Sequence, residues 1–150
     1  MIAVIQRVTQ ASVTVNTRTV GAIERGILAL VAVHKTDTSK DVEWMAKKLT
    51  ALRIFPNREK NFDQDVLTIA AGILLVSNFT VAAATAQGRR PSLDAAADPV
   101  KGRELFDQLI KTVRATGVTT ATGEFGGDMR VSLQNDGPVT FIVDSRPSPA

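Results

Sequence analysis

Hydroxyl, amide and backbone groups are the main candidates for chemistry in this sequence, because the usual catalytic and metal-binding side chains are scarce. The 150 residues include one histidine, His34, and no cysteine. These counts exclude disulfides and thiolate metal sites and argue against a zinc site. The sequence also lacks a Walker-type glycine loop and a Gly-x-Gly-x-x-Gly nucleotide-binding motif. We therefore expect no metal and no cofactor.

Thr80 is the residue placed most like a nucleophile, because it follows the strongly apolar run Gly72-Ile73-Leu74-Leu75. A hydroxyl group without a nearby base is only weakly nucleophilic. Together with Ser77 and Asn78, Thr80 is therefore interpreted as part of a hydrogen-bonding wall, and the open alternative is that these residues simply terminate a strand. His34 could act as the base of Thr80 in a small-molecule hydrolase, although a loop histidine without a catalytic duty is the simpler interpretation.

A second candidate is the stretch Asn135-Asp136-Gly137-Pro138, which joins two strand-like runs. Apolar and polar residues alternate in the first run, 129–134, and the second run, 139–143, is β-branched and aromatic. Asp-Gly between such runs would normally form a hairpin turn. Pro138 cannot donate a ladder hydrogen bond, so the loop is expected to present bare backbone to its surroundings. An ordinary tight turn is the alternative interpretation.

The elements that must position these residues are strands and two helices. Period-two and continuous apolar patterns predict strands at 1–8, 11–15, 19–23, 27–33, 53–55, 72–81 and 118–122, in addition to the two runs above. A capping box at Thr38 and Asp41 opens a helix over 39–52. Asp98-Pro99 opens a second helix that Gly117 ends. We predict one α/β domain over 1–143, a single layered domain whose β-rich core of about seven strands carries two amphipathic helices on one side.

Composition sets the broad class of the protein. Apolar residues make up 44% and charged residues 22% of the chain, and no apolar run approaches the roughly 20 residues that span a bilayer. We therefore expect no membrane association, a cytoplasmic location and a disordered tail over 144–150. The net charge of +3 is only a mild bias. Most clustered bases are interpreted as solvated surface charge, but Arg89-Arg90 follows the Ser-Asn-Phe-Thr stretch and could contact phosphate.

Several motifs, in this order and spacing, resemble the D-aminoacyl-tRNA deacylase family from residue 1 to about residue 143. They are Met1-Ile2-Ala3-Val4-Ile5-Gln6-Arg7-Val8, Ser77-Asn78-Phe79-Thr80, Gly88-Arg89-Arg90-Pro91-Ser92, Thr122-Gly123-Glu124-Phe125-Gly126-Gly127-Asp128-Met129 and Asn135-Asp136-Gly137-Pro138-Val139-Thr140. The resemblance implies a layered α/β fold, a homodimer, an aminoacyl-tRNA substrate and removal of D-amino acids from tRNA. Glycyl-tRNA is an implied second substrate, because glycine has no side chain to reject.

The resemblance also assigns roles to residues. The Ser77-Asn78-Phe79-Thr80 motif of one subunit would form the pocket, with main-chain N–H groups near Phe79 and Thr80 facing the oxyanion. The Gly137-Pro138 motif of the other subunit, with a cis peptide bond, would enter that pocket. Arg7 would support this loop, and Phe125 and Met129 would border the site. The terminal ribose 2′-hydroxyl of the RNA would assist hydrolysis, so no catalytic triad is required.

Two positions depart from the family pattern. Asn78 stands where glutamine is usual, which keeps the amide on a side chain one methylene shorter, and Gly127 stands where alanine is common. The first change puts the detail of the pocket in question more than the activity. A function of another class also stays open at this point: a non-catalytic RNA-binding module of the translation apparatus that uses Arg89 and Arg90.

Overall fold

The structure is a computed structural model that describes residues 1–147. The strands are β1 (Ile2–Val15), β2 (Arg18–Ile23), β3 (Gly26–Ala32), β4 (Gly72–Ser77), β5 (Thr119–Thr122) and β6 (Arg130–Asp144), and the helices are α1 (Ser39–Ala51), the short 3-10 helix η1 (Phe79–Ala82) and α2 (Pro99–Ala115). Residues 148–150 of the predicted disordered tail lie outside the described part. Before them, Ser145 donates its backbone N–H to the carbonyl of Met1 at 2.9 Å.

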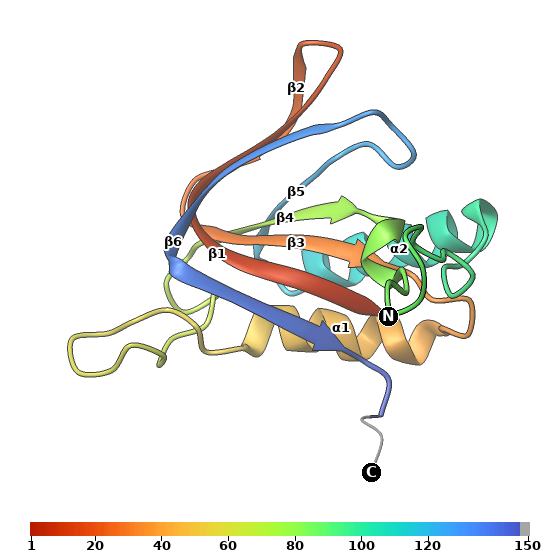
Figure 1. Ribbon diagram of the computed structural model, residues 1–150. Helices are drawn as coiled ribbons and strands as arrows, with labels where there is room; N and C mark the ends of the chain where they lie inside the picture. Colours follow the sequence, from red (N-terminus) through yellow and green to blue (C-terminus); the bar gives the residue numbers. More distant parts are fainter. Residues whose placement is uncertain (148–150) are drawn as a thin grey trace.

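All six strands belong to one sheet, in which β1 is the central element. The order is β2-β1-β3-β4-β5, and β6 also pairs with β1. One half of β1 lies between β3 and β6 and the other half between β2 and β6, and all these pairs are antiparallel. The β3–β4 and β4–β5 pairs are parallel. Figure 1 shows β6, in blue, running along β1 for almost its full length.

The sheet curls until its two ends nearly meet. A Cβ atom at Gly21 of β2 would lie only 2.1 Å from the carbonyl oxygen of Thr122 in β5. Only glycine can occupy such a position without moving one of the strands. The curled sheet is therefore a nearly closed barrel, which agrees with the predicted β-rich core.

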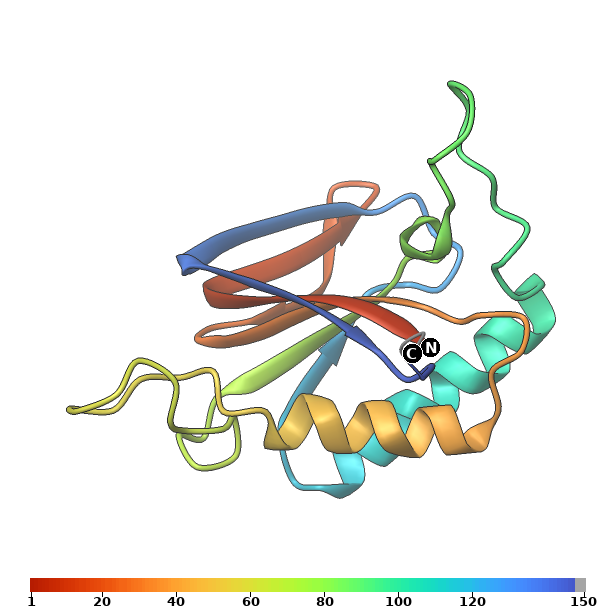
Figure 2. The same ribbon diagram turned by 60° about the horizontal axis from the view of Figure 1, so that its bottom comes forward.

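The two helices cover one face of the sheet, as predicted, and they lie side by side in Figure 2. Thr38 and Asp41 form the predicted capping box of α1, and the side chain of Asp98 caps α2 ahead of Pro99. Successive residues of β3 face opposite sides. Ile27 packs toward the helices and Leu28 packs inside the curl of the sheet, and both are fully buried. The two-sided burial predicted from the continuous apolar pattern is thus confirmed.

Four predicted element boundaries were wrong. The strands expected at 1–8 and 11–15 are one strand, β1, and the runs 129–134 and 139–143 are two halves of one strand, β6. The apolar strand from Gly72 ends at Ser77, not at Val81, because the chain turns into η1. The segment 53–55 forms only an isolated bridge between Phe55 and Gln64. The first two errors come from the pairing of β1 with β6, partners distant in sequence, which a local pattern does not contain.

Within residues 1–147, no helix is both long enough and apolar enough to cross a membrane.

Candidate active site

A cavity of about 1110 Å³ lies where β3 and β4 end, between η1, the start of α2 and the segment before β6. Among its walls are Ser77, Asn78, Phe79, Phe125 and Met129. Five of the predicted site residues, from two motifs distant in sequence, therefore share one cavity. Thr80, Arg7, Gly137 and Pro138 do not line this cavity.

The Ser77–Thr80 motif is placed by the end of β4. The backbone N–H of Asn78 donates to the carbonyl of Val31 at 2.8 Å, which holds the strand end against β3. The next residues form η1, so Phe79 is 58% exposed and Thr80 is exposed as well. The Thr80 hydroxyl donates to Oδ1 of Asn78. The shorter amide at position 78 thus fixes the hydroxyl, while the N–H groups at the start of η1 have no side-chain cap.

Phe125 and Met129 form another part of the wall, in which Phe125 packs against α2 and Met129 packs against the sheet. The Arg103 guanidinium lies 4.8 Å from the centroid of the Phe125 ring, and the Phe106 ring lies 6.0 Å from it. At Gly102 of α2, a Cβ atom would meet the Phe125 ring at 3.5 Å. The backbone N–H of Glu124 lies 3.4 Å from the Met129 sulfur.

Sequence reasoning missed the contribution of α2. Gly102 and Phe106 line the cavity together with the segment before the helix, of which Leu93, Asp94 and Asp98 are part. The helix was correctly predicted, but its register against the 123–129 loop depends on tertiary packing. A glycine inside a helical pattern was the available signal, because such a residue usually has a packing reason.

The charged groups that line the cavity are all acidic. They are the carboxylates of Asp94, Asp98 and Asp128, and Asp98 already accepts from the N–H groups of Val100 and Lys101. No lysine, arginine or histidine belongs to the wall as described. The cavity therefore favours a ligand with a positive group, such as an amine, near its rim.

The Gly137–Pro138 segment lies elsewhere on this chain and is exposed. It is a bulge inside β6. Gln6 pairs with Thr140 and Val8 pairs with Asn135, so residues 136–139 oppose the single residue Arg7. The alternative interpretation as an ordinary tight turn is therefore wrong, because the chain does not reverse here. The peptide bond between Gly137 and Pro138 is cis, and Gly137 has a φ of 151°, where L side chains are strained.

Two side chains hold the bulge in place. Arg7, which is 9% exposed, donates from Nε to the Asp136 carbonyl at 2.9 Å and from Nη1 to the Ile54 carbonyl at 2.8 Å. Asn135 accepts from the Val139 N–H at 2.7 Å and donates to the Val139 carbonyl at 3.2 Å. Its amide also contacts Gln6 and Thr140. The bulge is thus a fixed projection that Arg7 contacts directly, while a role for Arg7 in the active site stays a prediction.

His34 and Thr80 do not form a pair. The His34 Nδ1 lies 3.0 Å from the Thr36 hydroxyl, whereas the Thr80 hydroxyl is bound to Asn78. Burial, reinforced by the positive charge of Arg146, lowers the pKa of His34. Residues 1–147 contain no group of three or more side chains suited to a metal ion. This geometry does not favour the small-molecule hydrolase.

Arg89 and Arg90 are exposed in a loop whose ends are joined by a bridge between Ala84 and Ser92. Figure 2 shows this loop, in green, projecting away from the sheet. The two guanidinium groups are therefore accessible to a large partner, but they are not part of the cavity wall.

Comparison with known proteins identifies a family. A family model described as D-Tyr-tRNA(Tyr) deacylase matches residues 4–144. A D-aminoacyl-tRNA deacylase of Geobacter sulfurreducens is 51% identical over 146 residues, which are 97% of this chain and 96% of that protein. One from Methylococcus capsulatus is 52% identical over 147 residues, which are 98% of this chain and 96% of that protein.

Solved structures agree with this fold. One titled c-Myc DNA unwinding element binding protein superposes with a TM-score of 0.92 at 35% identity, covering 98% of this chain and all of that one. A second, titled as a probable eukaryotic D-amino acid tRNA deacylase, has a TM-score of 0.82 at 17% identity, covers 95% of this chain and 97% of that one, and shows the fold alone.

Proposed function

Because this chain belongs to the D-Tyr-tRNA(Tyr) deacylase family and is a hydrolase of the D-aminoacyl-tRNA deacylase class, we propose that a second copy of the chain completes its active site. The reaction is hydrolysis of the ester between a D-amino acid and the 3′-terminal adenosine of tRNA, in the cytoplasm. One observation carries the proposal. The cavity gathers Ser77, Asn78 and Phe79, but the fixed Gly137–Pro138 bulge is exposed and outside it.

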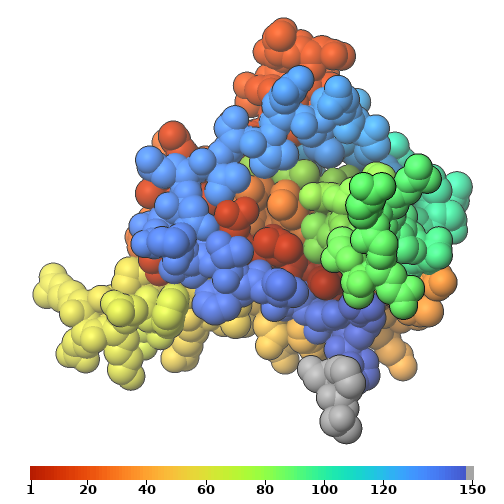
Figure 3. Space-filling view, in the orientation of Figure 1, coloured from red at the N-terminus to blue at the C-terminus, as the bar shows by residue number. Residues whose placement is uncertain are grey.

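The face that carries the bulge has the properties of a subunit interface. Ile142 is 73% exposed and Leu133 is 38% exposed, on the two sides of the bulge in β6. Figure 3 shows β6, in blue, running across this face toward the green segment that contains η1. Exposed apolar residues that follow one strand indicate a protein contact. A two-fold dimer through this face would bring each bulge to the other subunit's Phe79.

The bulge can act as a stereochemical filter made of backbone. Residues 136–139 do not pair with β1, so the peptide groups of Gly137 and Pro138 are outside the ladder. Their carbonyl groups would hold the substrate's α-amino group, which the acidic cavity also favours. An L side chain would then meet the bulge, while a D side chain would point to solvent. Tenfold discrimination needs about 1.4 kcal/mol, which one clash or one lost hydrogen bond supplies. Glycine has no side chain to exclude and is a second substrate.

The chemistry needs a water nucleophile and stabilisation of the oxyanion. Water adds to the ester carbonyl, and the bond to the ribose 3′-oxygen then breaks, which releases the free amino acid and tRNA. The uncapped N–H groups of Phe79 and Thr80 would donate to the oxyanion. The Thr80 hydroxyl, bound to Asn78, positions the substrate and is not a covalent nucleophile. The 2′-hydroxyl of the terminal ribose orients the water.

The remaining residues serve the RNA. Phe125 and Met129 border the cavity on the side of α2, where an adenosine ring could pack. Arg89 and Arg90, which are exposed, would meet phosphates beyond the cavity. A non-catalytic RNA-binding module would use the same two arginines, but it would not need the Gly137–Pro138 bulge.

The decisive experiment is hydrolysis of D- and L-tyrosyl-tRNA by the purified protein, with a chelator present. We expect release from the D ester only, and we expect it to persist in Thr80→Ser. Release from both esters would reject the filter, and tRNA binding without release would favour the binding module. A mixture of two variants that should each be inactive tests the shared site: Thr80→Pro, which removes a proposed oxyanion N–H group, and a bulge variant such as Gly137→Val. Activity that returns on mixing supports it, because a heterodimer then holds one intact site.

A further inference from the structure

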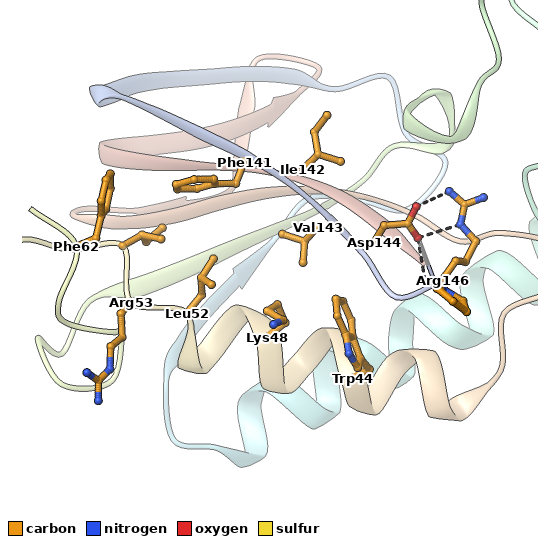
Figure 4. A pocket seen from close by; sticks show the side chains of 12 residues that line it. Trp44, Lys48, Leu52, Arg53, Phe62, Phe141, Ile142, Val143, Asp144 and Arg146 are labelled. Carbon is orange, nitrogen blue, oxygen red and sulfur yellow. Dashed lines mark hydrogen bonds and ion pairs between the residues drawn. The ribbon is translucent and has the colours of Figure 1, made fainter. Parts of the chain in front are cut away.

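A groove of about 910 Å³ lies between α1 and the C-terminal half of β6, and it shares no residue with the active-site cavity. Its volume is within the range of about 300 to 1,000 Å³ that is usual for ligand sites. Figure 4 shows its walls, which come from α1, the loop after it and β6. The lining residues are Trp44, Lys48, Leu52, Arg53, Ile54, Phe62, Phe141, Ile142, Val143, Asp144, Arg146 and Pro147.

Aromatic rings are exposed along this groove. Trp44, the single tryptophan of the chain, is 38% exposed, and Phe62 is 51% exposed. The rings of Phe62 and Phe141 meet edge to face, with centroids 6.0 Å apart. Exposed aromatic rings stack on unpaired bases without regard to base identity. The groove thus offers stacking surfaces at its two ends, one on α1 and one on the following loop.

Lys48, Arg53 and Arg146 bring positive charge to the wall of the same groove. The segment 47–61 contains five lysine or arginine residues and one acidic residue. Its net charge of +4 exceeds the net charge of the whole chain, which is +3. Lys48 Nζ lies 5.2 Å from the centroid of the Trp44 ring, and the Arg53 guanidinium points out of the groove in Figure 4. The groove's carboxylate, Asp144, is already paired with Arg146 at 2.5 Å. Aromatic rings below a basic rim match a base with its phosphate outside.

We propose that this α1–β6 groove binds an unpaired nucleotide of the tRNA substrate. The base packs against Trp44 or Phe62, and the flanking phosphates meet Lys48 and Arg53. The inference rests on the proposed function, because that function makes RNA the partner. It adds a contact outside the active-site cavity, with which the groove shares no residue, so the tRNA is held at a second place besides its aminoacyl end.

Trp44 reports binding directly, because no other tryptophan contributes to the fluorescence. Titration with deacylated tRNA and with a short single-stranded RNA should quench this emission. In the Lys48→Glu/Arg53→Glu variant, quenching should weaken, and the slope of log affinity against log salt should fall by roughly 1.4 for two lost phosphate contacts. The control is Lys111→Glu/Arg114→Glu, the same charge change on exposed residues of α2.

Kinetics separate this proposal from the proposed function. For D-tyrosyl-tRNA, the Lys48→Glu/Arg53→Glu variant should show a KM raised about tenfold with an unchanged kcat. Hydrolysis of D-tyrosyl-adenosine, which lacks the tRNA body, should equal that of the unaltered protein. If the unaltered protein does not hydrolyse D-tyrosyl-adenosine or D-tyrosyl-tRNA, the proposed function itself fails.

Three results would overturn the groove assignment while leaving the deacylase intact. One is an unchanged KM for D-tyrosyl-tRNA in the groove variant. Another is equal quenching by a blunt RNA duplex, which has no unpaired base. The third is Trp44 emission that depends on protein concentration and not on RNA, which would assign the groove to a second copy of the chain.

Discussion

Replacing Arg7 with lysine tests whether the hydrogen bond from Arg7 holds the bulge in β6 in place. Arg7 donates two hydrogen bonds to carbonyl groups that are distant in sequence, those of Asp136 and Ile54. A lysine keeps the charge, but its single nitrogen cannot reproduce the two directions of the guanidinium. One carbonyl group is then left without its donor. A hydrogen bond from a charged group contributes about 1.5–3 kcal/mol, so Arg7→Lys should lower the free energy of unfolding by about that amount.

The ion pair adds little to this estimate, because the Asp136 side chain is 40% exposed and lies 3.5 Å away. For a chain of this size, the loss corresponds to a fall in Tm of about 3–12 °C. Urea unfolding and hydrolysis of D-tyrosyl-tRNA should be measured on the same samples, with Arg18→Lys, an exposed change on β2, as the control. We expect activity to fall more than stability, because the bulge moves while the fold persists. Equal stability and activity in both variants would refute the reasoning.

Three further outcomes are expected. Gly102→Ala should raise the free energy of unfolding by about 0.5–1 kcal/mol in urea, because alanine favours the helix and its Cβ atom meets only the Phe125 ring, at 3.5 Å. Arg103→Ala should lower kcat/KM about two- to fivefold at unchanged Tm, through loss of the exposed cation–π contact with Phe125, and lysine should restore part of it. The hydrogen bond from Arg146 lowers the pKa of Asp144. The stability that this pair contributes is therefore complete above the ordinary carboxyl pKa of about 3.9 and is lost as the pH falls through the lowered value. Asp144→Asn should accordingly weaken the dependence of the free energy of unfolding on pH in the acid range.

The helices and the apolar strands could be predicted because their signals are local. The capping box at Thr38 and the proline at position 99 fix where the helices begin, and both were found where the sequence indicated. The continuous apolar pattern of β3 likewise gave a strand buried on both faces. These features depend on residues that are close together in the sequence, so a local sequence pattern predicts them.

The bulge could not be predicted, because its partner is distant. Asn-Asp-Gly-Pro favours a turn when only the flanking runs are considered. In the fold both runs pair with β1, so the four residues 136–139 bulge out opposite Arg7 while the strand continues.

The cavity also depends on contacts between residues distant in sequence. Phe125 was known as a site residue from the family resemblance, but Gly102 became visible only after α2 was packed against it.

The pairing of β1 with β6 has a consequence for folding of the protein during its synthesis on the ribosome. Ile2 pairs with Asp144, so the first strand to be synthesised waits for the last before its second edge is covered. At roughly 5–20 residues per second, that wait is on the order of ten seconds. During it, the long apolar edge of β1 is open to other chains. A chaperone that shields the nascent N-terminal segment should therefore raise the yield of this protein more than one that acts after release.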